Sequence, residues 1–298
     1  MAIRLKENFR AVFYAPYYAT HALGFFQREG IEVELVPSNA PGDAIAGLID
    51  GSIDLTWGGP MRVMRARDQD PRSTLVNFCE VVSRDPFFLI GRSPGAFDLK
   101  ELTRMRFASV SEVPTPWLCL QHDLRQHGID PDTLKRVSDR TMGRNYAAVR
   151  SGELDVMQAF EPFASLATKE RAGDILYIAS ARGLTVYTAF IATREAIARH
   201  RDAFAVITRA TARMQQWLYA SPPEDLAAAV TSFFPDVAPD ILAASLRRYR
   251  DASLWARTPA MSREGFDRLG QSLHSGGFIA RLPSYDDCVD QSFNGITP

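Results

Sequence analysis

Aromatic side chains are concentrated in the segment YAPYY, where Tyr14, Tyr17 and Tyr18 directly precede a helical pattern. The apolar run at residues 10–15 favours a first strand that ends at these rings. Ligands of open parallel sheets bind beyond the carboxyl ends of the strands. An aromatic ring can stack there on a planar ligand while a hydroxyl reaches a polar group. Tyr14 and Tyr17 are therefore candidate ligand contacts, with packing inside the protein as the alternative for each ring.

The segment WGGP lies between a predicted strand and a predicted helix. Gly58 and Gly59 would let backbone N–H groups approach a ligand, with Trp57 beside them as a further candidate contact. The helix that opens at Pro60 directs its positive end at this turn, and Arg62 in its first turn can form charge-assisted hydrogen bonds with an anion. A tight turn without a ligand is the alternative interpretation.

Hydroxyl groups are frequent in the segment SVSEVPTPW, which follows the first strand of a second series of elements. Ser109, Ser111 and Thr115 can each cap the following helix or bind a ligand, and capping is expected for one of them. Trp117 falls in the first turn of that helix. We expect Trp117 to face a cleft and to stack on a ligand ring from the side opposite Tyr14.

Two further segments carry polar groups near predicted helix starts. TMGRNYAAV supplies Arg144 and the candidate contact Asn145, and QAFEPF supplies the candidate contact Glu161. A carboxylate without a partner in a cleft favours a ligand with an amine or a ring N–H, whereas Arg62 and Arg144 favour an acidic group. Together these groups predict an aromatic or heteroaromatic acid or zwitterion. Surface ion pairing is the alternative for the arginines.

The remaining reactive side chains supply few candidates. His21 in the first helix is a candidate contact, with a surface or core position as the alternative, and Tyr187 is a candidate on a predicted crossing between lobes. The histidines have no paired metal spacing, and neither a phosphate-binding glycine motif nor G-x-S-x-G occurs. The cysteines form no metal motif or disulfide pattern. We therefore expect no catalytic residues, no metal and no cofactor.

The overall composition favours a globular protein with a small-molecule partner. The chain carries 34 Lys+Arg against 35 Asp+Glu, so its net charge of -1 supplies no field for nucleic acid or an anionic membrane. No apolar run approaches the length of a membrane span, and MAIRLKENFRAVF lacks the apolar core of a signal peptide. We expect a monomer without membrane insertion, cytoplasmic as the sequence stands or periplasmic if a signal was removed.

Strand and helix patterns alternate along the chain, which predicts largely parallel sheets. A first series spans residues 10–79, a second spans residues 106–180, and helices dominate from residue 195 onwards. The two series resemble each other where a helix ends at Gly51 or Gly152 and a short strand with Asp54 or Asp155 follows. This echo predicts two similar lobes, whose loops WGGP and QAFEP line opposite walls of one cleft.

Residues 81–93 and 183–193 are predicted to be extended crossings between the lobes. Lobe 1 would then comprise residues 1–92 and 190–298, with the C-terminal helices packed back on it. Lobe 2 would comprise residues 93–189. The predicted architecture is α/β, with a hinge between the two lobes.

Four segments in order carry a family resemblance: APYYATHALGFFQREGIEVELVP, DAIAGLIDGSIDLTWGG, FDLKEL and AAVRSGELDVMQAFEPF. They resemble the substrate-binding proteins of ABC importers for sulfonates, taurine and thiamine pyrimidine precursors, a family that also contains the thiamine pyrimidine synthases. The resemblance implies a type 2 periplasmic-binding-protein fold, with two α/β lobes around a ligand cleft and two crossover strands. It also implies a small-molecule ligand and, for an exported protein, an ABC permease as partner.

Two other functions fit the same scaffold. A cytoplasmic enzyme similar to a pyrimidine synthase, a decarboxylase or a desulfinase would need a nucleophile, an acid or a cofactor-binding lysine in the cleft. The chain lacks the cysteine-rich cluster of the synthases, and it has Tyr14, Ala15 and Pro16 where a related desulfinase places its nucleophilic cysteine. A ligand sensor that docks on a regulator is the other alternative. The residues favour a non-catalytic binding protein.

Overall fold

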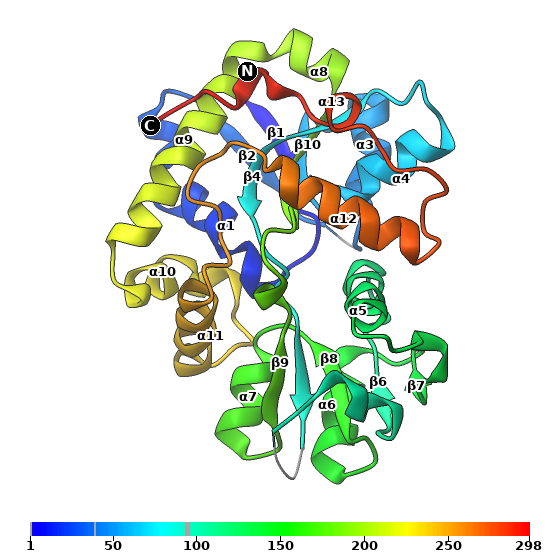
Figure 1. The fold of residues 1–298 in the computed structure, drawn as a ribbon. Coiled ribbons are helices and arrows are strands. Elements are labelled where there is room, and N and C mark those ends of the chain that lie inside the picture. The colour runs from blue at the N-terminus through cyan, green and yellow to red at the C-terminus, as the bar shows by residue number, and fades with distance from the viewer. Residues whose placement is uncertain (1, 39, 93–95) are drawn as a thin grey trace.

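Two five-stranded sheets, each in its own half of the molecule, organise the chain (Figure 1). The computed structural model describes residues 2–38, 40–92 and 96–298. The first sheet has the strand order β2-β1-β3-β10-β4, and the second has the order β7-β6-β8-β5-β9. We call the half built on the first sheet lobe 1 and the half built on the second sheet lobe 2.

The two sheets have matching topologies. In lobe 1, β1 is parallel to β2 and β3, whereas β10 is antiparallel to β3 and β4. In lobe 2, β6 is parallel to β7 and β8, whereas β5 is antiparallel to β8 and β9. The strands are β1 (Ile3–Lys6), β2 (Val33–Val36), β3 (Leu55–Gly58), β4 (Leu75–Val82), β5 (Phe88–Gly91), β6 (Phe107–Ala108), β7 (Arg136–Val137), β8 (Val156–Ala159), β9 (Asp174–Ile178) and β10 (Thr188–Thr193).

Helices cover both sheets and form most of the C-terminal third. In the described part of the chain, none of them combines the length and the hydropathy needed to cross a bilayer. The α-helices are α1 (Ala15–Ala22), α2 (Phe25–Arg28), α3 (Ala44–Asp50), α4 (Met61–Gln69), α5 (Thr115–Gln126), α6 (Met142–Ser151), α7 (Phe163–Glu170), α8 (Arg194–Arg199), α9 (Arg201–Ala220), α10 (Pro223–Val230), α11 (Pro239–Asp251), α12 (Arg263–Ser275) and α13 (Tyr285–Cys288). Short 3-10 turns include η1 (Val12–Tyr14) and η4 (Ala179–Arg182).

The first strand lies earlier than the sequence predicted. β1 occupies Ile3–Lys6, while η1 and the start of α1 occupy most of the run at residues 10–15. The strand alternates buried Ile3 and Leu5 with half-buried Arg4 and Lys6, as a paired strand should. Residues 11–15 of the later run are all buried, and a continuous apolar run does not distinguish a strand from a helix by its period. The prediction of a strand at residues 10–15 is therefore wrong.

The similarity predicted between the two lobes includes their hydrogen bonds. In lobe 1, Arg4 N donates to Asp54 Oδ2 at 2.9 Å and Arg4 Nη2 donates to the carbonyl of Gly51 at 2.9 Å. In lobe 2, Arg106 N donates to Asp155 Oδ2 at 2.7 Å, and its Nη2 donates to the glycine carbonyl at position 152 at 2.8 Å. Both glycines adopt the left-handed conformation that ends the preceding helix. The two lobes thus repeat the same helix–turn–strand unit.

Two segments connect the sheets, as the sequence predicted. The chain leaves β4 at Val82 and enters lobe 2 at β5, then leaves β9 and returns to lobe 1 at β10. We call residues 83–87 and 179–187 the first and second crossing. Strand β5 already belongs to the second sheet, and β10, which starts at Thr188, belongs to the first. The chain therefore changes lobes a few residues before the boundaries predicted at residues 92 and 190.

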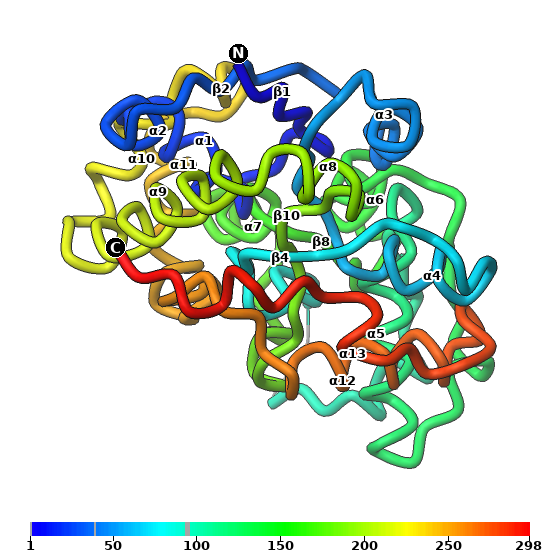
Figure 2. The backbone as a smooth tube through the Cα atoms, turned by 90° about the horizontal axis from the view of Figure 1, so that it is seen from above, coloured from blue at the N-terminus to red at the C-terminus, as the bar shows by residue number. Residues whose placement is uncertain are grey.

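The C-terminal third packs mainly on lobe 1. Helix α9 lies against α1 and α2, and the segment after α12 runs beside β4, where Asn77 and Val289 form a parallel bridge (Figure 2). Two helices also reach lobe 2, because α11 contacts α7 and α12 contacts α5 (Figure 1). The prediction that these helices pack back on lobe 1 therefore describes only part of their contacts.

Candidate functional site

A cavity lies between the lobes, beside the two crossings. Its lining comes from lobe 1, from lobe 2 and from both crossings, so only the folded arrangement of the lobes creates it. The cavity measures about 30 Å³, which is room for water and not for an organic ligand. We call it the interlobe cavity. Its lining residues are Asn8, Phe9, Phe13, Tyr14, Gly59, Met61, Arg62, Phe87, Val113, Pro114, Thr115 and Tyr187.

Arg62 brings a positive charge to the interlobe cavity from the first turn of α4. Burial lowers its pKa, and nearby Tyr14 and Asp43 oppose that change. Gly42 leaves space for the guanidinium, since a Cβ at that position would lie 2.0 Å from Arg62 Nη1. Within the described ranges, Arg62 forms no ion pair, and Asp43 pairs with Lys6 at 3.1 Å. A largely buried guanidinium that has a carboxylate nearby but no salt bridge to it favours an anionic ligand.

Hydroxyl groups accompany this charge. Asn8 Nδ2 donates to Tyr14 Oη at 3.0 Å. Burial raises the pKa of Tyr14 to about 12, so the phenol keeps a proton that it can donate. In the part of the chain that the structure describes, the buried Tyr187 Oη has no hydrogen-bond partner. Because an unpaired buried hydroxyl costs about 1 to 3 kcal/mol, this group favours a polar occupant of the cavity.

Two helices direct their N-termini at the interlobe cavity. Gly59 precedes α4, Thr115 begins α5, and both residues line the cavity. Free backbone N–H groups and the helix dipole make such ends favourable for a negative charge. The described lining residues include no carboxylate. Positive and donating groups therefore converge from both lobes.

Apolar rings form the rest of the lining. Phe13 lies 4.3 Å from Tyr14 between ring centroids, and Phe9 contacts both of these rings. Phe87 on the first crossing lies 6.1 Å from the ring of Tyr187 on the second. An anion with an apolar, ring-sized body matches these walls.

Four other predicted lobe 1 contacts lie outside this lining. Tyr17 and Trp57 stack on each other inside lobe 1, with ring centroids 4.7 Å apart and planes 8° apart. Gly58 is paired with Ala189 in the sheet, and a Cβ there would lie 3.3 Å from a side chain on β10. His21 is half-buried on α1, and burial lowers its pKa. For these residues, packing describes the observed contacts.

Trp117 does not face Tyr14 across the interlobe cavity. Its ring packs 5.9 Å from the ring of Phe107, and the Arg136 guanidinium lies 4.4 Å from its centroid, all within lobe 2. In an α-helix, residues two apart point to nearly opposite sides. Since Thr115 faces the cavity, Trp117 faces away from it. The predicted sandwich of a ligand between Tyr14 and Trp117 is wrong.

The other polar candidates of lobe 2 hold a loop together. Ser109 Oγ accepts from Arg136 at 2.9 Å, and Ser111 Oγ donates to the carbonyl of Arg140 at 2.8 Å. Asn145 Nδ2 reaches the carbonyl oxygens of Ser109 and Arg140 at 3.5 and 3.4 Å. Arg144 is exposed to solvent. Among these candidates, only Thr115 lines the interlobe cavity.

Glu161 has its own partners and is no free acceptor for a ligand. Its carboxylate accepts from Ser165 N at 2.9 Å and from Arg248 Nε at 2.8 Å, and Ser245 Oγ lies 3.2 Å away. Burial raises its pKa, against the opposing effects of Ser165 and Arg248. The prediction of an unpaired carboxylate in the cleft is wrong, because α11 supplies the counter-ion. Glu161 instead ties lobe 2 to that helix.

Sequence analysis missed Asn8 and Phe87, which both line the interlobe cavity. Asn8 stands two residues beyond the end of β1, where a ligand contact is expected, so correct placement of that strand would have identified it. Phe87 lies within a segment predicted as a crossing. A crossing runs beside the cleft between the lobes it connects, which is the signal that could have identified this residue.

Buried charges join the crossings to lobe 2. Arg182 of the second crossing pairs with Asp85 of the first crossing and with Asp123 of α5. The lobes also meet where α12 packs on α5, with His122 Nδ1 and Ser275 Oγ 3.2 Å apart. These contacts, together with the small interlobe cavity, describe a closed arrangement of the lobes.

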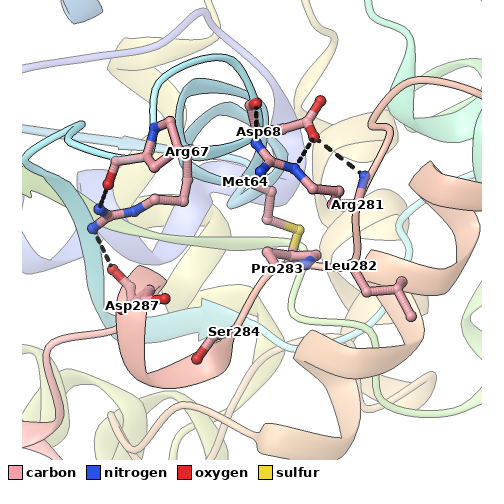
Figure 3. Close-up of a pocket in the computed structure, with 9 residues that line it drawn as sticks. Met64, Arg67, Asp68, Arg281, Leu282, Pro283, Ser284 and Asp287 are labelled. Atoms are coloured by element: carbon pink, nitrogen blue, oxygen red, sulfur yellow. Dashed lines mark hydrogen bonds and ion pairs between the residues drawn. The ribbon is translucent and has the colours of Figure 1, made fainter.

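A surface crevice on lobe 1, between α4 and residues 281–287, offers a comparison (Figure 3). It measures about 280 Å³ and contains two arginines. Arg281 pairs with Asp68 at 3.6 Å, and Arg67 donates to the carbonyl of Asp287 at 2.9 Å. Because these charges already have partners, the crevice offers an anion less than the interlobe cavity does.

Comparisons with known proteins agree with this architecture. Residues 12–225 match the profile of the family described as NMT1/THI5 like. The YtlA protein of Bacillus subtilis (strain 168) is 24% identical over 295 residues, which cover 97% of this chain and 87% of YtlA. The family profile, which matches more than half of the chain, confirms the family resemblance seen in the sequence.

Solved structures share the fold at low identity. SsuA from Escherichia coli superposes with a TM-score of 0.78 and 16% identity, over 98% of each chain. NrtA from Synechocystis PCC 6803 superposes with a TM-score of 0.68 and 12% identity, over 96% of this chain and 83% of its own. Both are described as periplasmic binding proteins, so the predicted two-lobed periplasmic-binding-protein fold is confirmed.

Proposed function

Because this chain belongs to the NMT1/THI5-like family, we propose that it is a solute-binding protein that closes over a small organic anion and delivers it to an ABC-type importer. YtlA is named as a candidate binding protein, SsuA as an aliphatic sulphonate-binding protein and NrtA as a nitrate-binding protein. Sulphonates and nitrate are both anions. SsuA and NrtA are described as periplasmic, and we place this protein in the same compartment.

The observation that carries the proposal is the unpaired guanidinium of Arg62 in the interlobe cavity. The hydroxyls of Tyr14 and Tyr187 and the N-terminal ends of α4 and α5 add further donors around it. An oxyanion accepts hydrogen bonds at several oxygens and would satisfy these groups together.

The lining also narrows the class of ligand. The rings of Phe9, Phe13 and Phe87 suit an aromatic or heteroaromatic body. Since Glu161 is engaged by Arg248 and the described lining holds no carboxylate, nothing in it favours a ligand ammonium group. We therefore prefer an aromatic carboxylate or sulfonate over a zwitterion.

Ligand entry requires the lobes to separate. A cavity of about 30 Å³ neither admits nor encloses a ring, so the lobes must separate for entry and must stand further apart around a bound ligand than they do in this structure. The crossings at residues 83–87 and 179–187 are the segments that would bend. A ligand shifts the equilibrium toward the closed state only through contacts with both lobes, and Arg62 and Thr115 supply one from each.

We assign no catalytic step to this site. Burial raises the pKa of Tyr14 to about 12 and that of Tyr187 well above its ordinary value, so both phenols stay protonated at neutral pH. They are suited to donate hydrogen bonds to a ligand rather than to act as bases.

The test is a thermal-shift screen followed by calorimetric titration, with benzoate, benzenesulfonate and benzylamine as probes at constant ionic strength. We expect the two anions to raise Tm and benzylamine to leave it unchanged, because only the anions match the donors. A ligand present at 100 times its Kd would stabilise the folded protein by about 2.7 kcal/mol.

Two variants make the screen decisive. Arg62→Gln should weaken the binding of the responding anion, whereas Arg281→Gln, at the exposed crevice arginine, should leave it unchanged. No Tm change with either anion, or equal affinity in Arg62→Gln and the unmodified protein, would contradict the proposed ligand class.

A further inference from the structure

A second pocket lies behind the crossings and shares no lining residue with the interlobe cavity. It measures about 310 Å³, which is in the range of small-molecule sites. Its walls come from the end of β4, from both crossings and from residues 253–262, between α11 and α12. We call it the hinge pocket.

Backbone hydrogen bonds hold the walls of the hinge pocket in place. Ser83 N donates to the carbonyl of Leu254 at 2.9 Å, and Ala256 N donates to the carbonyl of Val81 at 2.9 Å. Residues 253–262 therefore lie along the edge strand of lobe 1 like an added strand, which makes the pocket a preformed feature of the fold.

Three guanidinium groups gather at the hinge pocket. Arg84 and Arg257 line it, and Arg250 lies beside them, donating to the carbonyl of Tyr219 at 2.9 Å. The Arg257 guanidinium stacks 3.9 Å from the centroid of the Tyr219 ring, and Arg84 donates to the carbonyl of Ser180 at 3.1 Å. Burial raises the pKa of Tyr219, and all three arginines oppose that rise.

The structure describes no salt bridge between these arginines and an acidic residue. In residues 2–38, 40–92 and 96–298, none of the three forms an ion pair with a carboxylate, in contrast to Arg281 and Asp68 in the lobe 1 crevice. Like charges that converge without a counter-ion repel each other, and a bound anion would relieve that repulsion.

Glu80 is the acidic residue of the hinge pocket, and it adds a donor rather than a negative charge. Burial raises its pKa to about 8, so it is largely protonated at neutral pH. Its Oε2 accepts from Ser262 N at 2.8 Å, whereas Oε1 is buried without a hydrogen-bond partner among the described residues. The proton therefore belongs on Oε1, which needs an acceptor that the described chain does not supply.

We propose that the hinge pocket binds a small organic polyanion, through carboxylate or phosphoryl oxygens held by Arg84 and Arg257. The volume exceeds that of a single inorganic oxyanion, and two converging guanidinium groups suit a molecule with more than one acidic group. Because Arg84 and Leu184 belong to different crossings, such a molecule touches both segments that bend when the lobes separate.

The test is calorimetric titration with citrate and, in a separate arm, glycerol 3-phosphate, at pH 7 and constant ionic strength. We expect at least one of them to bind, and the stronger arm distinguishes carboxylate from phosphoryl recognition. Arg257→Gln and Arg84→Gln should each weaken that binding at least tenfold. Arg257 is exposed, so its substitution should leave the fold intact.

Two controls separate this proposal from the proposed function. Arg281→Gln and Arg62→Gln, in the lobe 1 crevice and the interlobe cavity, should both keep the polyanion affinity within twofold of the unmodified protein. Heats no larger than those of a sodium chloride titration would overturn the proposal. Affinity that survives Arg257→Gln and Arg84→Gln, or that disappears in Arg62→Gln, would also overturn it.

Discussion

The turns after β3 and after β8 occupy equivalent places in the two lobes but have different roles. Both follow the same helix–turn–strand unit, with Asp54 bonded to the backbone of Arg4 in lobe 1 and Asp155 to that of Arg106 in lobe 2. In lobe 1 the turn leads through Gly59 to Arg62, whose charge faces the interlobe cavity unpaired. In lobe 2 the equivalent turn ends at a carboxylate that is fully engaged.

The difference arises from a neighbour outside the repeated unit. Helix α11 packs on α7 and brings Arg248 and Ser245 to Glu161. Arg62 forms no salt bridge with a described side chain, and the nearby carboxylate of Asp43 is paired with Lys6 at 3.1 Å. The repeated unit therefore leads to two similar turns, although Glu161 corresponds to Pro60 and Arg62 to Phe163 in the shared register. The elements packed around each turn decide whether its charged group serves stability or binding.

Replacing Glu161 should have the largest effect. Glu161→Ala leaves Arg248 without its counter-ion and Ser165 without its acceptor, so we expect a loss of about 3 to 5 kcal/mol in the free energy of unfolding. Urea unfolding measures this loss. Glu264→Ala, which removes an exposed carboxylate paired with Arg268 at 3.0 Å, is the matched control and should cost less than about 1 kcal/mol. If Glu161→Ala kept full stability but lost anion binding, the turn after β8 would serve binding and not stability, which would contradict the roles assigned to the two turns.

The buried carboxyl of Glu80 in lobe 1 should make stability depend on pH. Glu80 in lobe 1 accepts one hydrogen bond, and burial raises its pKa from 4.5 to about 8. Between pH 4.5 and about 8 the folded protein holds this proton, whereas the unfolded chain has released it. The stabilising contribution is therefore complete below pH 4.5 and falls as the pH rises toward 8. We expect a loss of about 3 kcal/mol between about pH 5.5 and 8.

Urea unfolding of the protein and of Glu80→Gln across this pH range measures the effect. The variant cannot release a proton from this position, so its stability should change less with pH. Parallel pH profiles for the two proteins would show that Glu80 does not hold a proton in the folded state.

Arg62 should affect binding rather than stability. Arg62→Gln removes the positive charge from the interlobe cavity, and we expect a loss of about 2 to 3 kcal/mol in the affinity for an aromatic anion, roughly 30- to 150-fold. The free energy of unfolding without ligand should stay the same or rise, because no counter-ion is left unpaired. Titration and urea unfolding of the same preparation check both results, and a large stability loss would make Arg62 the equivalent of Glu161.

Gly42 should have the smallest effect. It has a φ of +85°, and a Cβ there would lie 2.0 Å from Arg62 Nη1, so Gly42→Ala should displace the guanidinium. We expect a stability loss of about 1 kcal/mol from the backbone and an additional several-fold loss of anion affinity. Gly51→Ala is the control, since Gly51 has a φ of +77° with open space around its Cβ position. Equal affinity in the two variants would contradict this placement of Arg62.

The sequence alone determined the local units of this protein. The strand–helix alternation, the helix at residues 115–126 and the repeated turns at Gly51 and Gly152 all follow from patterns within one or two turns of chain. These features depend on periodicity and on glycine's freedom at positive φ, which are properties of neighbouring residues. The first strand is the exception. An apolar run that is buried on every side shows neither the alternation of a strand nor the spacing of a helix, so its pattern does not distinguish the two.

The tertiary structure alone decided which polar groups are free. Glu161 and Arg248 are far apart in sequence, so no local pattern could show that the carboxylate is engaged. The direction of Trp117 depends on which side of α5 meets lobe 1, and the lack of a salt bridge to Arg62 among the described residues depends on how Asp43 is held by Lys6. Residue type predicts what a side chain can bind, whereas packing between distant segments determines whether its partner is already part of the protein.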